Sequence, residues 1–517
     1  MTHSKLIKVL ELYEISLLRA KNKFDLGEID STLNYLELAS LIAIFFPFKK
    51  NFGDDTIELL LYKLHSKIDY KKYNPSQNIV LYCSTVRDFG ALVQQYLYNL
   101  PKLTLIVHEK IINHESEEII NFLKINKVEF YIIGKEKSFS EKINLTTTIL
   151  FQVKPSKIFL HIDPTDVFAA TFFIGFKKIT YFINHADHLF WIGRNSFENI
   201  IEFRTYGYWF SKKFRGIKNV NSYILPFYPI LPKASFNSDL IFNEESVIGV
   251  SGANLYKFNQ DSSLTFFKII IKLLKKNKNF VFILCGNGDS RQIKNLIDSE
   301  NLADRFKIYG FRKDFSNIIR NSDIYFNSYP IGGGLAQLYA LFYNIPVVSV
   351  VDNVRSGDTL ESLFNISTYK SLDDIHDVKD FADRLIKSKL FRKEIAIKQT
   401  PGGFNEKHFK NLLSEIIEGK VLSYKSSKEF KFNYEMNLTN ALNEKDLLNN
   451  VLYLNFIYNI KYISLFDRFT EFFKTIKNLE LPSLKLIIKI FIVFFGLKSF
   501  LTSIINKLKN LYNNTLY

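Results

Sequence analysis

Three consecutive glycines, Gly332, Gly333 and Gly334, lie between an apolar run that ends at Asn327 and a stretch of helical spacing that starts near Leu335. This order predicts a buried strand, a turn and the first turn of a helix. Backbone N–H groups at a helix start are unpaired and attract anions. Glycines let a ligand approach the main chain without an intervening Cβ. Taken alone, the segment fits a diphosphate site and an ordinary tight loop of an α/β sheet equally well.

Polar, basic and small residues also follow the ends of other apolar runs in this half of the chain. Six of them could reach the same ligand: Ser251, Asn254, Lys257, Gly286, Asn287 and Arg312. The carboxyl ends of parallel strands meet at one sheet edge, where open α/β sheets bind ligands. A single lysine or arginine there would be an ordinary solvated charge. Their predicted convergence on Gly332–Gly334 favours a diphosphate site.

A second polar group follows the apolar run Ile179–Ile183, where His185 and His188 flank Asp187. Transfer of a group to a hydroxyl needs a base for the acceptor proton, or donors that hold a leaving phosphate. We expect His185 or Asp187 to be the base and His188 to orient it or contact phosphate. A solitary histidine is usually structural, but two beside an aspartate at a strand end favour catalysis. Arg204 follows a further strand end, with Asp187 or the diphosphate as its expected partner.

These residues need a scaffold, and the apolar runs supply it. Short runs alternate with helical stretches in two series, which predicts parallel, doubly wound sheets. The runs are Ile79–Cys83, Leu103–His108, Val128–Ile133, Lys157–Ile162 and Ile179–Ile183, then Val247–Val250, Phe280–Cys285, Phe306–Tyr309, Asp323–Asn327 and Val347–Val350. Between the series the pattern breaks at Pro226, Pro229 and Pro232, which indicates a linker.

The fold class is therefore α/β, with two Rossmann-like domains. We expect a helical N-terminal region at 1–76, a first sheet domain at 77–230, a second at 231–425 and a helical C-terminal region at 426–517. A chain of 517 residues is long enough for several cores.

The amino-acid composition and charge indicate which kinds of protein this chain is and which partners it has. With 47% hydrophobic and 23% charged residues, the chain is globular. Cys83 and Cys285 lie in predicted buried strands, which suits a reducing compartment. No metal-ligand spacing is visible, and Met1–Lys23 has no uninterrupted apolar core of a signal peptide, so we expect a metal-free cytoplasmic protein. The net charge of +16 is scattered without a nucleic-acid motif, so we expect no nucleic-acid partner.

Two segments resemble a known group of enzymes. Asn254-Leu255-Tyr256-Lys257 resembles a segment of the O-GlcNAc transferase clan, and so do Ile345–Ser349 with Ser356–Ser362. The bacterial cytosolic protein N-glucosyltransferases share this plan. Two Rossmann-like domains with a proline-containing link are also typical of GT-B glycosyltransferases, whose domains face each other across a cleft. The resemblance covers 247–365, under a quarter of the chain.

The resemblance implies roles for single residues. Lys257 would neutralise the diphosphate, and Gly332–Gly334 with Leu335 would supply backbone N–H groups beside it. The clan has an acidic ribose-binding residue where this chain has Tyr339. Asp358 or Glu361 are the candidates to replace it.

The predicted function is a metal-independent glycosyltransferase that moves a sugar from a nucleotide diphosphate, with a UDP-sugar as the expected co-substrate and no bound cofactor. The expected acceptor is a cell-surface glycan or a lipid-linked glycan. Alternatives are a protein O- or N-glycosyltransferase, a nucleotide-sugar 2-epimerase, and a catalytically degenerate scaffold of a glycan-assembly complex.

The segment 484–509 is an amphipathic helix by pattern. Lys485, Lys489 and Lys507 share one face, and Ile, Leu, Val and Phe occupy the other. Its longest apolar run, Ile490–Leu497, is shorter than the roughly 20 residues that span a bilayer. The pattern predicts an in-plane helix on an anionic membrane surface. The alternative is a helix packed on the protein itself.

Overall fold

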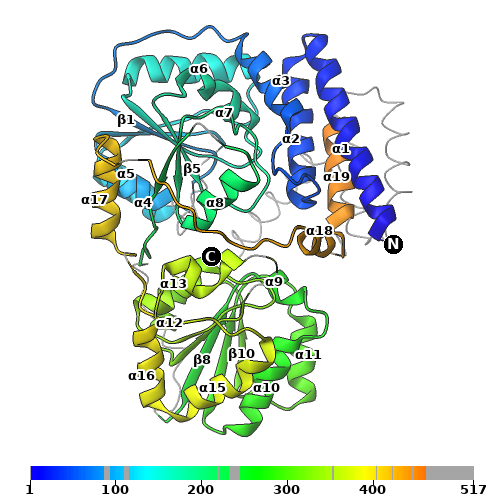
Figure 1. The fold of residues 1–517 in the computed structure, drawn as a ribbon, viewed down its shortest axis with the longest axis vertical. Helices are drawn as coiled ribbons and strands as arrows, with labels where there is room; N and C mark the ends of the chain where they lie inside the picture. Colours follow the sequence, from blue (N-terminus) through cyan, green and yellow to red (C-terminus); the bar gives the residue numbers. More distant parts are fainter. Residues whose placement is uncertain are drawn as a thin grey trace, which may run out of the picture.

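The computed structural model describes residues 2–86, 93–109, 116–217, 220–231, 245–351, 354, 356–402, 404–421, 423–443 and 447–460. Two sheet domains lie one above the other, and a group of helices stands beside the upper one (Figure 1). All the sheet pairings between named strands are parallel, as the alternating pattern predicts. The two Rossmann-like domains are therefore confirmed.

The first domain is built on a sheet of order β3-β2-β1-β4-β5-β6-β7. Its strands are β1 (Ile79–Cys83), β2 (Leu103–Val107), β3 (Glu129–Ile132), β4 (Lys157–His161), β5 (Thr180–Asn184), β6 (Asn199–Glu202) and β7 (Asn221–Ile224). Its helices are α4 (Val93–Asn99), α5 (Glu117–Ile125), α6 (Phe139–Val153), α7 (Val167–Phe172), η2 (Phe173–Phe176) and α8 (Thr205–Lys213). Strands β1 and β5 are buried along their whole length, which explains their apolar sequences.

The second domain has a sheet of order β10-β9-β8-β11-β12. Its strands are β8 (Val247–Gly252), β9 (Phe280–Cys285), β10 (Phe306–Tyr309), β11 (Ile324–Phe326) and β12 (Val347–Val348). Its helices are α9 (Tyr256–Asn259), α10 (Thr265–Lys276), α11 (Arg291–Ser299), α12 (Phe315–Arg320), α13 (Gly334–Phe342), η4 (Ser356–Asp358), α14 (Leu360–Phe364), η5 (Ile375–Asp377), α15 (Val378–Lys387) and α16 (Lys389–Lys398). In α10, the buried Phe267, Ile270 and Leu274 recur at helical spacing and pack into this domain's core.

The helices beside the first domain come from both ends of the chain. They are α1 (Thr2–Asp25), α2 (Ile29–Phe45), α3 (Asp55–His65), α18 (Tyr434–Asn443) and α19 (Leu447–Ile460). Tyr13, Leu36 and Val451 from three of them share one buried cluster. Asp54 caps α3, because its carboxylate accepts hydrogen bonds from the amides of Thr56 and Ile57.

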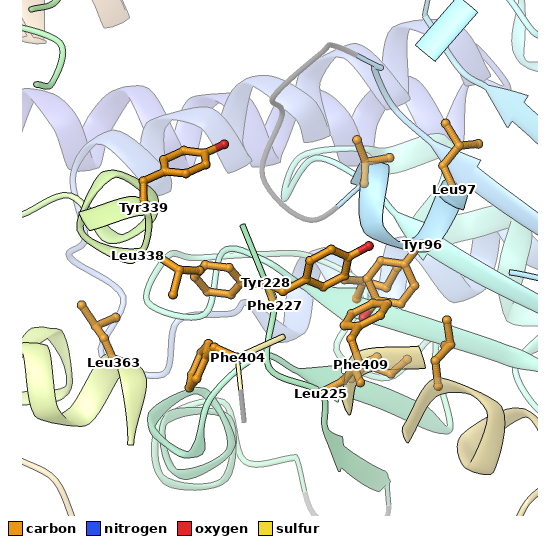
Figure 2. Packing of buried hydrophobic residues seen from close by; sticks show 14 of the residues in the cluster. Tyr96, Leu97, Leu225, Phe227, Tyr228, Leu338, Tyr339, Leu363, Phe404 and Phe409 are labelled. Atoms are coloured by element: carbon orange, nitrogen blue, oxygen red, sulfur yellow. The ribbon is translucent and has the colours of Figure 1, made fainter. Parts of the chain in front are cut away.

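Helix α17 (Glu406–Ile417) follows the second domain in sequence but packs on the first. Its Phe409 is fully buried and lies edge-on to Tyr96 of α4 and to Tyr228, at ring-centroid distances of 5.4 and 5.3 Å (Figure 2). Beyond α17, Tyr424 donates a backbone hydrogen bond to Ser222 of β7. The chain therefore crosses from the first domain to the second and back again.

The described residues contain no helix that is both long and apolar enough to cross a bilayer. The predicted amphipathic segment 484–509 lies outside the described residues.

Candidate active site

A cavity of about 500 Å³ opens at the carboxyl edge of the second sheet. It is bordered by the loops after β8, β9 and β10 and by the start of α13. The residues that line it are Gly252, Ala253, Asn254, Lys257, Cys285, Gly286, Asn287, Phe311, Arg312, Lys313, Phe315, Ser316, Gly333, Gly334, Leu335, Ala336 and Tyr339. Most of the donor-site residues predicted from the sequence thus meet at one place.

The N-terminus of α13 faces this cavity with its glycines. The Gly333 amide donates to Oδ1 of Asn327 at 3.0 Å, and the Lys257 ammonium donates to the Gly332 carbonyl at 2.9 Å. A Cβ built on Gly334 would have no atom within 4 Å, so the protein's own packing does not demand glycine at this position. Open space above unblocked backbone at a helix start suits the close approach of an anion.

Close packing requires a glycine at position 286. Its φ is +150°, and a Cβ there would lie 1.8 Å from the Ala253 carbonyl oxygen. The loops after β8 and β9 therefore touch through backbone, and the Leu255 amide donates to the Asn287 carbonyl at 2.8 Å. This contact fixes the relative position of the two loops that carry Asn254 and Asn287.

Three cationic side chains line the cavity: Lys257, Arg312 and Lys313. Arg312 forms two 2.8 Å hydrogen bonds with the carboxylate of Asp314, which offsets part of its charge. Lys257 stands directly over the glycine turn, so it is the cation best placed for a diphosphate bound there.

Four other residues assigned to the donor from sequence do not line the cavity. Ser251 is fully buried beneath the loop, and Gly332 offers its carbonyl to Lys257 instead. Asp358 bonds to Arg204 of the first domain at 2.7 Å. Glu361 accepts hydrogen bonds from the amide and hydroxyl of Ser371 at 3.1 and 2.7 Å. The structure therefore brings neither carboxylate to this cavity.

Tyr339 does line the cavity, and its hydroxyl donates to the Ile230 carbonyl at 2.8 Å. Ile230 belongs to the link between the domains. Figure 2 shows Tyr339 beside Leu338 in the packing between the domains. The residue that replaces the clan's ribose acid thus supports the interdomain link.

A second cavity, of about 290 Å³, lies between the two domains. His188 of the first domain lines it together with Tyr329, Pro330 and Ile331, which lead into the glycine turn of the second domain. One continuous segment, 329–334, therefore contributes residues to both cavities. His188 faces the segment that precedes the proposed diphosphate position.

The carboxylate of Asp187 lies within hydrogen-bond distance of the His188 ring. Its Oδ1 lies 3.1 Å from Nδ1 of His188, and Arg204 donates to its two oxygens at 2.5 and 2.9 Å. Arg204 and the neighbouring His188 lower the pKa of the buried Asp187, despite the opposing effect of burial. The pairing of Arg204 with Asp187, expected from the sequence, is present. A carboxylate with a lowered pKa that is paired with an arginine is a poor proton acceptor, although it can orient its neighbours. The geometry therefore does not support Asp187 as the base.

His185 is placed less favourably than His188. Its ring stacks on His161 at a centroid distance of 4.3 Å, and its Nδ1 is buried with no hydrogen-bond partner among the described residues. Burial lowers the pKa of His185. His185 does not line the interdomain cavity, whereas His188 does.

Two further buried charges surround Asp187. Burial and the charge of Asp187 raise the pKa of Glu202 to about 7, while its oxygens accept from Asn184 and Ser211 at 2.9 and 2.8 Å. Arg215 donates to the Asp187 carbonyl at 3.0 Å. The sequence alone does not reveal this buried charge layer, because nothing in it distinguishes Glu202 at the end of β6 from other acidic residues at strand ends.

A third cavity, of about 750 Å³, lies at the carboxyl ends of β1, β2 and β4 and is closed on one side by α2. Its lining is rich in polar groups, among them Glu37, His108, Lys135 and Asp163. Burial, with repulsion from Asp166, raises the pKa of Asp163 to about 6. Among the described residues, no group of three or more His, Cys, Asp or Glu side chains is placed to hold a metal ion.

Residues 245–387 match the family described as Glycosyl transferases group 1. No curated protein sequence matches the chain. Among solved structures, a Listeria monocytogenes protein described as a UDP-N-acetylglucosamine 2-epimerase is 12% identical, with a TM-score of 0.50 over 68% of this chain and 100% of that one. An O-GlcNAc transferase of Thermobaculum terrenum is 11% identical, with a TM-score of 0.47 over 79% of each chain. HepE of Anabaena, solved with UDP and glucose, is 10% identical, with a TM-score of 0.48 over 66% of this chain and 100% of that one.

Proposed function

The chain has the GT-B fold and its residues 245–387 match a glycosyltransferase family, and on that premise we propose that it transfers a sugar from a UDP-sugar to a glycan or lipid-linked acceptor. One observation carries the proposal: the segment 329–334 lines both the basic cavity that contains Lys257 and the interdomain cavity that contains His188. A donor whose diphosphate lies at this turn would place its nucleoside in the first cavity and its sugar in the second.

The proposed mechanism uses only residues of the chain. Lys257, Arg312 and the α13 N-terminus offset the charge that develops on the leaving diphosphate, so no metal ion is required. His188 accepts the proton of the acceptor hydroxyl as that oxygen attacks the anomeric carbon. The bond from the anomeric carbon to the diphosphate breaks, and its electron pair leaves with the diphosphate oxygen. This replaces the sequence-based assignment of the base to His185 or Asp187.

The polar cavity at the carboxyl edge of the first sheet supports a carbohydrate acceptor. Carboxylates, lysines and His108 along its wall match the many donors and acceptors of a glycan. We propose that an acceptor glycan extends from the interdomain cavity toward this region.

The direct test is to incubate the protein with UDP-sugars and candidate acceptors, then analyse products by mass spectrometry. Lys257→Ala is expected to raise the Kd of UDP by about 10- to 100-fold, because a hydrogen bond to a charged group is lost. The exposed Lys294→Ala is the matched control, and it should bind UDP as the wild type does. If no UDP-sugar is consumed and UDP does not bind, the proposed function is wrong.

The stereochemistry of the product gives a separate test of His188. Direct displacement by a hydroxyl inverts the anomeric configuration, and the coupling constant of the anomeric proton reports it. Retention would exclude a single displacement with His188 as its base while leaving the transferase activity itself intact.

A nucleotide-sugar 2-epimerase remains the second candidate, because a protein so described shares this fold. An epimerase would convert the UDP-sugar into its isomer without releasing UDP, whereas a transferase releases UDP only with an acceptor. Product analysis separates the two, and it also separates a glycan from a protein acceptor. A scaffold would bind its partners and release no UDP from any donor.

The lysine-rich face of 484–509 supports peripheral contact with an anionic membrane, as part of this proposal. Replacing Lys485, Lys489 and Lys507 by glutamate in the full chain should abolish flotation with anionic vesicles. A control that replaces the exposed Lys272, Lys278 and Lys294 by glutamate should float as the wild type does. Equal flotation of the two triple variants would contradict the assignment of this helix.

A further inference from the structure

A chain of hydrogen bonds links the second domain to the histidine of the first. Arg204 donates from its Nη1 to the Gly357 carbonyl and to Oδ1 of Asp358, each at 2.7 Å. Through its Nε and Nη2 the same guanidinium holds both oxygens of Asp187. Asp187 in turn meets Nδ1 of His188 at 3.1 Å. Four side chains from two domains thus form one connected series.

Burial makes this series electrostatically effective. The side chains of Arg204 and Asp187 are 3% and 1% exposed, that of Asp358 is 22% exposed, and that of His188 is 33% exposed. Charges taken out of water interact more strongly than surface pairs. Only the histidine end of the series reaches the interdomain cavity.

The charges in the series do not cancel. Asp187 and Arg204 neutralise each other, and Asp358 adds one negative charge beyond the arginine. Three further titratable groups face Asp187: Glu202, Arg215 and His185. These three belong to the first domain, so Asp358 is the charge in this set that the second domain contributes. A nearby negative charge raises the proton affinity of an imidazole.

We propose that Asp358 is a positioning residue for His188, acting through Arg204 and Asp187, so that a carboxylate of the donor domain tunes the proton affinity of the histidine in the other domain. The inference deepens the proposed function and rests on it. It also gives Asp358 a role in place of the ribose contact expected from the sequence.

The chemical consequence concerns a single proton. In the proposed transfer, the proton leaves the acceptor hydroxyl for Nε2 of His188 while the acceptor oxygen bonds to the anomeric carbon. The resulting imidazolium keeps its Nδ1 proton in the hydrogen bond to Asp187. The Nε2 proton then passes to water, which restores the neutral base. Asp358 affects only the proton affinity of the His188 ring, through Arg204 and Asp187, and it contacts no reacting atom.

The test compares Asp358→Asn with the wild type. The asparagine oxygen can still accept from Arg204, but the negative charge is lost. We expect the titration of His188, followed by NMR of the ring in the UDP complex, to move down by about 0.5–1 pH unit. The acid limb of kcat should move down equally, because a weaker base stays neutral at lower pH. The Kd of UDP should be unchanged, since Asp358 does not line the donor cavity.

Two further variants separate tuning from structural support. Asp358→Glu keeps the charge and should return the His188 titration toward that of the wild type. Asp373→Asn removes an exposed carboxylate of the same domain that pairs with Lys370 at 3.2 Å, and it should leave the titration of His188 unchanged. Loss of activity at all pH values with an unmoved His188 titration would overturn the inference. The NMR measurement needs no turnover, so a failure of the proposed transferase activity is recognised independently.

Discussion

At the scale of single residues, Glu202 offers a test of the buried charge layer behind His188. Burial and the charge of Asp187 raise its pKa from 4.5 to about 7. A raised carboxyl pKa means that the folded state holds the proton more tightly than the unfolded state. The energetic penalty of ionising Glu202 in the folded state is therefore absent below pH 4.5, grows between pH 4.5 and about 7, and is complete above that pH.

Glu202→Gln should remove this penalty. Between pH 5 and pH 8, the wild type is expected to lose about 2.5 kcal/mol of unfolding free energy relative to the variant. Urea unfolding of both proteins at the two pH values measures the difference. Parallel pH dependence of the two proteins would show that Glu202 titrates normally.

Gly334 tests the anion site at the residue scale. Because a Cβ there meets no atom within 4 Å, Gly334→Ala should leave the melting temperature unchanged or raise it, as alanine favours helix. We expect the Kd of UDP to rise about tenfold or more, since the methyl group occupies the ligand's approach to the backbone. The control is Gly310→Ala, which also has room but lies outside the cavity lining. Equal UDP binding by both variants would place the diphosphate elsewhere.

The sequence predicted which residues line the cavity better than it predicted which side chains pair with one another. Lys257, Gly333 and Gly334 could be assigned because strand ends of a parallel sheet converge at one edge. The partner of Asp358 could not, since Arg204 lies 154 positions away in another domain. The choice among His185, Asp187 and His188 also depended on which side chain faces the cavity. Spacing along a loop does not determine that direction.

At the scale of elements, Phe409 is one of the buried residues through which α17 packs on the first domain. Phe409→Ala should destabilise the protein by about 3–5 kcal/mol, because the buried ring leaves a cavity between Tyr96 and Tyr228. Hydrogen exchange should accelerate first in α17 and α4. The exposed Lys410→Ala on the same helix is the control and should change neither quantity. Unchanged exchange in α4 would mean that the two helices are not energetically coupled.

Elements with strong apolar runs were predicted within one or two residues of their observed bounds. β1 and β9 match the predicted Ile79–Cys83 and Phe280–Cys285. β7 was missed, because Asn221 and Ser222 interrupt its short apolar pattern. The packing partner of α17 was also not predicted, since a helix's periodicity shows which face is apolar without identifying the surface that covers it.

At the scale of the whole molecule, one buried cluster joins the two domains. Leu81 and Phe159 of the first sheet and Tyr325 and Leu338 of the second domain belong to it. We therefore expect one calorimetric transition, which UDP shifts as a whole to higher temperature. Two separate transitions, with only one of them sensitive to UDP, would show that the domains unfold independently.

The return of the chain through α17 also bears on how such proteins can be recombined. In sequence, the second domain is inserted between the first domain and the helices α17, α18 and α19, which pack on the first domain and its neighbouring helices. A chimaera that exchanges donor specificity should be joined between Leu231 and Glu245 and again between Thr400 and Asn405. A chimaera joined only before the second domain would also exchange α17, α18 and α19, which pack on the first domain and its neighbouring helices.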